Sequence, residues 1–175
     1  MGPSGAGKDS VLRFARQALA PTRRVAFAHR YITRPMDPTG ENHIALTPEE
    51  FELRRAAGLF AFHWRAHDIS YGIGVEIETW RRAGFVVVVS GSREHFQGVR
   101  RDDLDIRPVL ITAPAALLER RLVSRGRDDG AAVTARLERG AAYPAIENAL
   151  VIENSGALAD AGGRLVEFLS RVCKT

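Results

Sequence analysis

The 175-residue chain contains one cysteine, and aromatic residues make up 7% of it. Its only cysteine is Cys173, so no disulfide can form within the chain. No apolar run approaches the ~18 residues of a membrane-spanning helix, and the glycine-rich start does not resemble a secretory signal. With 45% hydrophobic and 26% charged residues, we expect one soluble, cytoplasmic domain over residues 1–175, without a membrane partner.

Lysine is also scarce. Of the 25 basic residues, 23 are arginine, and the two lysines are Lys8 and Lys174. The net charge of +4 is small, and the arginines are spread in small groups, whereas a nucleic-acid surface needs them clustered on one face. The pattern favours a small polyanion over DNA or RNA and leaves the oligomeric state open. A lysine at position 8 marks a place where a compact charge matters.

Helical and strand-like apolar patterns alternate along the chain. Helices are expected at 8–19, 48–57, 75–83, 114–124, 131–143 and 157–172, and strands at 25–28, 85–89, 109–112 and 150–152. The run 85–89 lacks alternation, which is typical of a parallel strand buried on both faces. Residues 29–46 are expected to form an irregular functional loop, and residues 59–73 are ambiguous. The alternation predicts an α/β fold, a parallel sheet flanked by helices.

The strongest chemical signal is a glycine-rich loop. The segment Gly2-Pro3-Ser4-Gly5-Ala6-Gly7-Lys8 matches the first seven positions of the G-x-x-x-x-G-K-[ST] phosphate loop, and an amphipathic helix follows it. Glycines let successive backbone N–H groups surround a phosphate, the helix N-terminus adds positive potential, and the lysine reaches the β- and γ-phosphates. A glycine-rich turn before a helix is the alternative. The spacing, the lysine and the helix together favour a P-loop NTPase that binds ATP.

Two features depart from that pattern. Asp9 stands where a serine or threonine would bind Mg²⁺, so Asp9 or the following Ser10 is expected to hold the metal. A phosphate loop normally follows a buried strand, and the chain starts at Met1, so the first strand is apparently missing. After the strand at 85–89, Ser90-Gly91-Ser92 offers no acidic ligand, which leaves ATP, water and the loop as the main metal ligands.

Three further blocks of sequence indicate which class of P-loop enzyme the chain resembles. They are Arg30-Tyr31-Ile32-Thr33-Arg34-Pro35, Gly40-Glu41-Asn42-His43 and Ser70-Tyr71-Gly72. With the loop, they resemble the guanylate kinase superfamily, in which T-R-x-P, G-E and Y-G segments surround the acceptor's phosphate. The chain is most similar to the ribose 1,5-bisphosphate phosphokinases of phosphonate degradation, at residues 2–10, 29–34, 40–46, 71–77 and 83–93. The resemblance implies a guanylate kinase-like fold and the ATP-dependent conversion of ribose 1,5-bisphosphate to 5-phosphoribosyl 1-diphosphate (PRPP).

The resemblance also implies roles for individual residues. An acceptor-binding insert at about 29–73 would use Arg30, Arg34, Glu41 and Tyr71. A helical lid at about 122–139 would bring Arg125 and Arg136 to the transferring group, where they would join Lys8 in catalysis. Solvated surface charge is the alternative for these arginines. The residues expected to contact ATP are Gly2, Pro3, Ser4, Gly5, Ala6, Gly7, Lys8, Asp9, Ser10, Arg121 and Asn154.

Guanylate kinase itself fits the residues less well. Its second phosphate-binding arginine would fall near Asp37, and its guanine-reading glutamate near Phe62, which cannot accept a hydrogen bond from a base. Two alternatives stay open. One is a nucleoside monophosphate kinase with relaxed base choice, and the other is a guanylate kinase-like binding module without catalysis.

Overall fold

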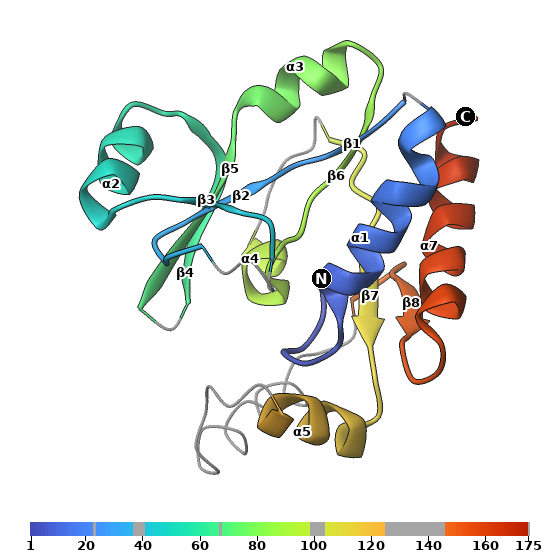
Figure 1. Ribbon diagram of the computed structural model, residues 1–175. Coiled ribbons are helices and arrows are strands. Elements are labelled where there is room, and N and C mark those ends of the chain that lie inside the picture. The colour runs from blue at the N-terminus through green and yellow to red at the C-terminus, as the bar shows by residue number, and fades with distance from the viewer. Residues whose placement is uncertain (23, 37–40, 67, 99–103, 125–145, 175) are drawn as a thin grey trace. The chain divides into compact units, whose positions relative to one another are not determined.

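The structure is a computed structural model that describes residues 1–22, 24–36, 41–66, 68–98, 104–124 and 146–174 (Figure 1). The chain divides into two compact units. Unit 1 comprises Met1–Gln17 and Gly91–Phe168, and unit 2 comprises Ala18–Ser90 and Leu169–Thr175. Among the described helices, none is both long enough and apolar enough to cross a membrane.

The sheet of unit 1 is a parallel pair of strands. β7 (Val109–Thr112) and β8 (Leu150–Glu153) pair in register, with the buried Ile111 beside Ile152. Met1 extends this pairing, because its amine donates to the Val109 carbonyl at 2.9 Å and its carbonyl accepts from the Ile111 N–H at 2.9 Å. These two bonds follow the pattern of a parallel ladder. The glycine-rich loop therefore leaves directly from the edge of β7.

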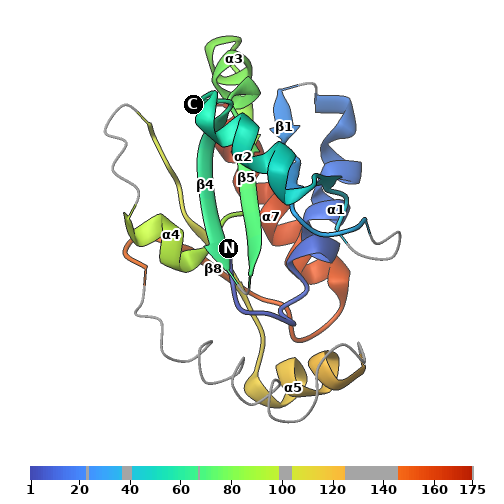
Figure 2. The ribbon, with the colours of Figure 1, turned by 90° about the vertical axis from the view of Figure 1, so that its left-hand side faces the viewer.

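The helices α1 (Lys8–Leu19) and α7 (Leu158–Val172) lie side by side (Figures 1 and 2). Within unit 1, α1 buries Val11 and Ala15, and α7 buries Leu165. Gly162 of α7 lies so close to the ring of Phe14 that a β-carbon there would overlap it. The small residue thus lets the two helices approach closely at Phe14.

The other helices of unit 1 are α4 (Arg93–Gly98) and α5 (Ala115–Ser124). α5 buries Leu118 and Leu122. A β-carbon at Gly5 would lie 3.2 Å from the Leu118 carbonyl oxygen and 3.4 Å from the Leu122 side chain. The glycine-rich loop therefore rests on α5.

Unit 2 contains a four-stranded sheet with the order β3-β2-β5-β4. Its strands are β2 (Arg30–Ile32), β3 (Ile44–Ala45), β4 (Phe60–Ala66) and β5 (Ile69–Gly74). β4 and β5 form an antiparallel hairpin, seen side by side in Figure 2, while β2 pairs antiparallel with β5 and parallel with β3. The expectation that residues 29–46 are wholly irregular is therefore wrong. Strands this short carry almost no periodic signal, and pairing with the distant β5 determines β2.

The helix α2 (Pro48–Ala56) packs against this sheet through Phe51. The side-chain oxygen of Thr47 accepts a hydrogen bond from the Glu50 N–H at 3.1 Å, which confirms the helix start read from the sequence. Phe51 is buried and stacks on Phe60 of β4, with ring centres 4.7 Å apart. This contact attaches the helix to the hairpin that carries part of the candidate site.

Unit 2 also contains a parallel pair, β1 (Val25–Phe27) and β6 (Val86–Val88), together with α3 (Glu76–Arg82) and a short 3-10 helix, η1 (Ala20–Thr22). The parallel pairing of β6 is confirmed. Burial on both faces is not, because Val86–Val88 are half-buried and Phe85 is 37% exposed. Among the described residues, β1 is the only strand paired with β6, so β6 is an edge strand here.

Candidate active site

The glycine-rich loop of unit 1 has the backbone shape of a phosphate cradle. Gly5 and Gly7 have φ angles of +84° and +78°, in the left-handed region that favours glycine. The loop then enters α1, which begins at Lys8. Left-handed residues turn successive N–H groups toward one side, and the helix start adds further N–H donors at the same place. The loop predicted from the sequence is thus formed, and its ligand stays a prediction.

Two predicted ATP-contacting side chains hold this loop from other elements. Asn154, directly after β8, is 5% exposed, and its amide donates to the Ala6 carbonyl at 2.9 Å. A β-carbon at Gly7 would overlap that amide. Arg121 of α5 donates from Nη1 to the Gly5 carbonyl at 3.4 Å. Both residues therefore shape the loop, and their contacts with ATP stay predictions.

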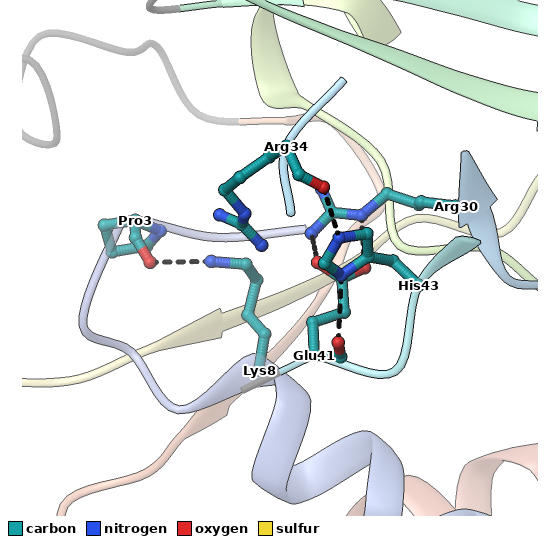
Figure 3. A network of polar contacts seen from close by, with 6 residues as sticks. All are labelled: Pro3, Lys8, Arg30, Arg34, Glu41 and His43. Carbon is teal, nitrogen blue, oxygen red and sulfur yellow. Dashed lines mark hydrogen bonds and ion pairs between the residues drawn. The ribbon is translucent and has the colours of Figure 1, made fainter. Parts of the chain in front are cut away.

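Lys8 is the first residue of α1, and its Nζ donates to the Pro3 carbonyl at 2.9 Å (Figure 3). The ammonium group therefore lies against the loop whose phosphate ligand it is predicted to bind. Asp9 and Ser10, both half-buried, follow in the first turn of the helix. No group of three or more His, Cys, Asp and Glu side chains forms a metal cluster in the described part of the chain. One or two oxygen donors with phosphate and water suit Mg²⁺, so these residues fit that ion.

Three of the four predicted acceptor-binding residues come together in unit 2. Arg30 donates from Nε and Nη2 to the two carboxylate oxygens of Glu41, and their side chains are only 15% and 12% exposed (Figure 3). The guanidinium carbon of Arg30 lies 5.2 Å from the centre of the Tyr71 ring. Trp64 also stacks on Tyr71, with ring centres 5.4 Å apart and planes inclined by 6°. The register of β4 and β5, which places Trp64 opposite Tyr71, fixes this stack.

Arg34, the fourth predicted acceptor residue, follows the end of β2. The hydroxyl of Thr33 accepts from the Ser70 N–H at 2.8 Å and so anchors the backbone just before Arg34. The Nε atom of Arg34 is buried and has no hydrogen-bond partner in the described part of the chain. Leaving a buried donor unsatisfied costs about 1–3 kcal/mol, and more for a charged group. An anion that accepted this hydrogen bond would remove that cost.

Two buried polar residues in unit 2 were not predicted as site residues. His43 is 2% exposed, with Nδ1 3.0 Å from the Glu41 carbonyl and Nε2 3.1 Å from the Arg34 carbonyl (Figure 3). Ser90, at the carboxyl end of β6, is 8% exposed, and its hydroxyl has no hydrogen-bond partner within the described ranges. Two features of the sequence could have pointed to these residues. His43 stands just before the strand residue Ile44, and Ser90 follows a strand at a position where an acidic metal ligand is usual.

Tyr31 lies on the other face of β2 from Arg30, because successive side chains alternate along a strand. Its hydroxyl donates to Glu76 Oε1 at 3.4 Å, and Arg54 lies 5.4 Å from its ring centre. Burial raises the pKa of Tyr31, and the Glu76 carboxylate raises it further. The hydroxyl therefore stays protonated at neutral pH and remains a donor. This network joins β2 to α2 and α3 and supports the strand that carries Arg30.

The predicted lid falls almost entirely outside the described residues. Arg125 and Arg136, the predicted catalytic arginines, lie there, as does the helix expected at 131–143. Only the first residues of the predicted lid, at the end of α5, are described. The catalytic roles of both arginines stay predictions.

The chain is closely similar to several curated proteins, although no protein-family model matches it. It is 48% identical to ribose 1,5-bisphosphate phosphokinase PhnN of Chromobacterium violaceum, over 99% of this chain and 94% of that protein. The protein of the same name in Thiobacillus denitrificans is 46% identical, over 97% and 90% of the two chains. A relative in Laribacter hongkongensis is 47% identical, and the chain spans 42% of its length.

Among solved structures, the chain is similar to guanylate kinase from Anaplasma phagocytophilum. The TM-score is 0.66 at 15% sequence identity, and the match covers 99% of this chain and 84% of that one. At this identity the likeness establishes the fold alone. It confirms the α/β, guanylate kinase-like P-loop architecture expected from the sequence.

Proposed function

This chain belongs to the ribose 1,5-bisphosphate phosphokinase family, and we propose that it transfers the γ-phosphoryl group of ATP to ribose 1,5-bisphosphate, giving ADP and PRPP. The observation that carries the proposal is the loop Gly2–Lys8, whose left-handed Gly5 and Gly7 shape an amide-lined cradle at the start of α1. A small, highly charged acceptor also suits the half-buried Arg30 and the buried, unsatisfied Nε of Arg34 in unit 2. We also propose that the reaction takes place in the cytoplasm, where ATP is available.

On the donor side, the β- and γ-phosphates would accept hydrogen bonds from the loop amides between Gly2 and Lys8. Lys8 would exchange its hydrogen bond with the Pro3 carbonyl for one with a phosphate oxygen. Asp9 or Ser10 would hold Mg²⁺, which when bound neutralises part of the polyphosphate charge. Asn154 and Arg121 would keep the loop in this shape through the Ala6 and Gly5 carbonyls.

On the acceptor side, Arg34 would donate its unsatisfied Nε hydrogen to a substrate phosphate. Arg30, held by Glu41 and the Tyr71 ring, would present its remaining N–H groups to the same bisphosphate, and Tyr71 would donate a hydrogen bond. Guanidinium groups suit this task because their planar fork matches phosphate oxygens. The predicted lid arginines, Arg125 and Arg136, would add positive charge at the transferring group.

The chemical step needs no general base from the protein. The C1 phosphate has a second pKa near ~6 and is therefore anionic at neutral pH. One of its oxygens attacks the γ-phosphorus of ATP, the bond from that phosphorus to the β,γ-bridging oxygen breaks, and the electron pair leaves with ADP. The protein contributes charge stabilisation and alignment of the two phosphate groups.

A nucleoside monophosphate kinase is the second candidate, because the fold is that of guanylate kinase. Phe62, near the position of a guanine-reading carboxylate, lies in β4 opposite Ile73, and a phenyl ring offers no hydrogen-bond acceptor to a base. A binding module without catalysis is the third candidate. A module of that kind has no need of the lysine and glycines of the loop.

The test is an acceptor panel with purified protein, ATP and Mg²⁺. Ribose 1,5-bisphosphate, ribose 5-phosphate and GMP are supplied in turn. A coupled enzyme assay measures the release of ADP, and phosphorus NMR identifies the product. We expect kcat/KM for ribose 1,5-bisphosphate to exceed that for GMP by about tenfold or more. A preference for GMP would move the assignment to a nucleotide kinase. Binding of ATP without transfer to any acceptor would support a non-catalytic module.

A further inference from the structure

His43 lies at the base of the segment that carries Arg34 and Glu41. It immediately precedes β3, which pairs in parallel with β2 at Tyr31 and Ile32. The imidazole is 2% exposed, and each ring nitrogen faces a main-chain carbonyl, Nδ1 that of Glu41 at 3.0 Å and Nε2 that of Arg34 at 3.1 Å. One side chain therefore joins two points of the backbone that lie seven residues apart in the sequence.

The two carbonyls determine the chemistry of the ring. A carbonyl oxygen can only accept a hydrogen bond, so both ring nitrogens are donors if both bonds form. A neutral imidazole has a single N–H, whereas the imidazolium has two. We propose that His43 is a positioning residue for the acceptor site, and that as a doubly protonated imidazolium it ties the backbone at Arg34 to the backbone at Glu41. The proposal rests on the proposed function, because that function makes Arg34 and Arg30 the groups that bind the acceptor.

The consequence for the site follows through two routes. The bond to the Arg34 carbonyl fixes the backbone from which the guanidinium with the unsatisfied Nε extends. The bond to the Glu41 carbonyl fixes the residue whose carboxylate holds both Nε and Nη2 of Arg30. Arg30 in turn lies over the Tyr71 ring. All four predicted acceptor residues are thus connected to one buried ring.

The charged residues that these hydrogen bonds connect are Arg34, Glu41 and Arg30. The charges of Glu41 and Arg30 compensate each other in their ion pair. The imidazolium is stabilised instead by the carbonyl dipoles of Arg34 and Glu41.

The first experiment compares His43→Gln with His63→Gln, a matched change at an exposed histidine of β4. Glutamine cannot donate along both ring directions, and a lost hydrogen bond to a charged group corresponds to a decrease of about tenfold or more. We expect kcat/KM for ribose 1,5-bisphosphate to fall by that factor, with KM for ATP unchanged. His63→Gln is expected to keep the wild-type kcat/KM for the acceptor. Equal losses for both substrates, or an unchanged kcat/KM for the acceptor in His43→Gln, would overturn the positioning role.

The second experiment needs no substitution at His43 and no turnover. Nitrogen NMR of the labelled wild-type protein near neutral pH reports whether each ring nitrogen carries a proton, and replacing the other four histidines one at a time assigns the signals. Two protonated nitrogens on the His43 ring support the proposal, and a single proton contradicts it. If the wild type phosphorylates no ribose 1,5-bisphosphate, the proposed function fails, while this measurement still decides the state of the ring.

Discussion

The two units present their proposed phosphate-binding groups in different ways. In unit 1, the donors at the glycine-rich loop are main-chain N–H groups, which Gly5 and Gly7 turn to one side, and Lys8 is the single charged side chain among them. In unit 2, the donors are guanidinium groups, and each depends on neighbours, Arg30 on Glu41 and Tyr71, and Arg34 on the backbone held by His43. The loop is a local structure, whereas the acceptor site is a network assembled from four strands and the segments between them.

That difference predicts different responses to mutation. A cradle of backbone amides cannot be removed by changing one side chain, so its charged lysine is its most sensitive point. A network of side chains can be weakened at any of its members, and each loss is smaller and confined to the acceptor. The comparison can be tested by four substitutions.

The largest effect is expected for Lys8→Ala. The lysine is the only side-chain cation within the loop segment, and removing one preorganised electrostatic group from an active site costs about 10²–10³ in rate. We expect kcat to fall by at least that factor while the circular dichroism spectrum is unchanged. Lys174→Ala, at the only other lysine, is the matched control and should keep full activity. Substantial turnover by the Lys8 variant would contradict the loop assignment.

The second effect is expected for Arg34→Gln. It removes the buried donor that we assign to the acceptor phosphate, and the loss of a charged hydrogen bond corresponds to about 10–100-fold in kcat/KM for ribose 1,5-bisphosphate. KM for ATP should not change, because the amide cradle is intact. Arg65→Gln, at a guanidinium whose side chain is 71% exposed, is the control. If Arg34→Gln weakened the binding of ATP as much as that of the acceptor, the proposed division of donor and acceptor binding between the two units would be wrong.

The third substitution, Glu41→Gln, tests whether the ion pair positions Arg30. Glutamine retains one oxygen acceptor but leaves the guanidinium charge uncompensated at a site where the two side chains are only 15% and 12% exposed. We expect the free energy of unfolding to fall by about 1–3 kcal/mol and kcat/KM for the acceptor to fall by about tenfold. Chemical denaturation and steady-state kinetics measure the two effects. Glu52→Gln, which alters an exposed ion pair with Arg55, should change neither by a measurable amount.

The smallest effect is expected for Thr47→Ala. The change removes the oxygen that accepts from the Glu50 N–H at the start of α2, and loss of such a cap typically costs about 1 kcal/mol of stability. The midpoint of urea unfolding should fall, while both KM values and kcat stay within error of the wild type. A loss of acceptor binding here would mean that the network of unit 2 extends as far as this helix.

The same contrast explains what the sequence could reveal. The loop, the helix that follows it and the capped start of α2 are short-range structures, so glycine spacing and Thr47 predict them directly. The strands β2 and β3 were not predicted, because they contain three and two residues and are paired with partners elsewhere in the chain. The resemblance to a known family predicted that Arg30, Glu41 and Tyr71 bind the acceptor, and the structure brings these three residues together.

The residues that contact the predicted site residues were harder to recognise, because those contacts exist only in the folded chain. Trp64 acquires its place from the register of β4 and β5, and His43 from two carbonyls on either side of its segment. Asn154 was expected to contact ATP, and its hydrogen bond to the Ala6 carbonyl shows that it supports the glycine-rich loop. The half-buried β6 was misjudged because a run of valines reports propensity for a strand but not how many neighbours the strand has.

The ion pair between Arg30 and Glu41 has a consequence for the approach of the substrate. Two opposite charges held together produce little potential beyond their immediate surroundings, so Arg30 attracts a distant anion far less than an unpaired cation would. In the proposed function, Arg30 would act through contact once the acceptor has arrived. The association rate of the bisphosphate should therefore decline with ionic strength more gently than the number of arginines in this segment suggests.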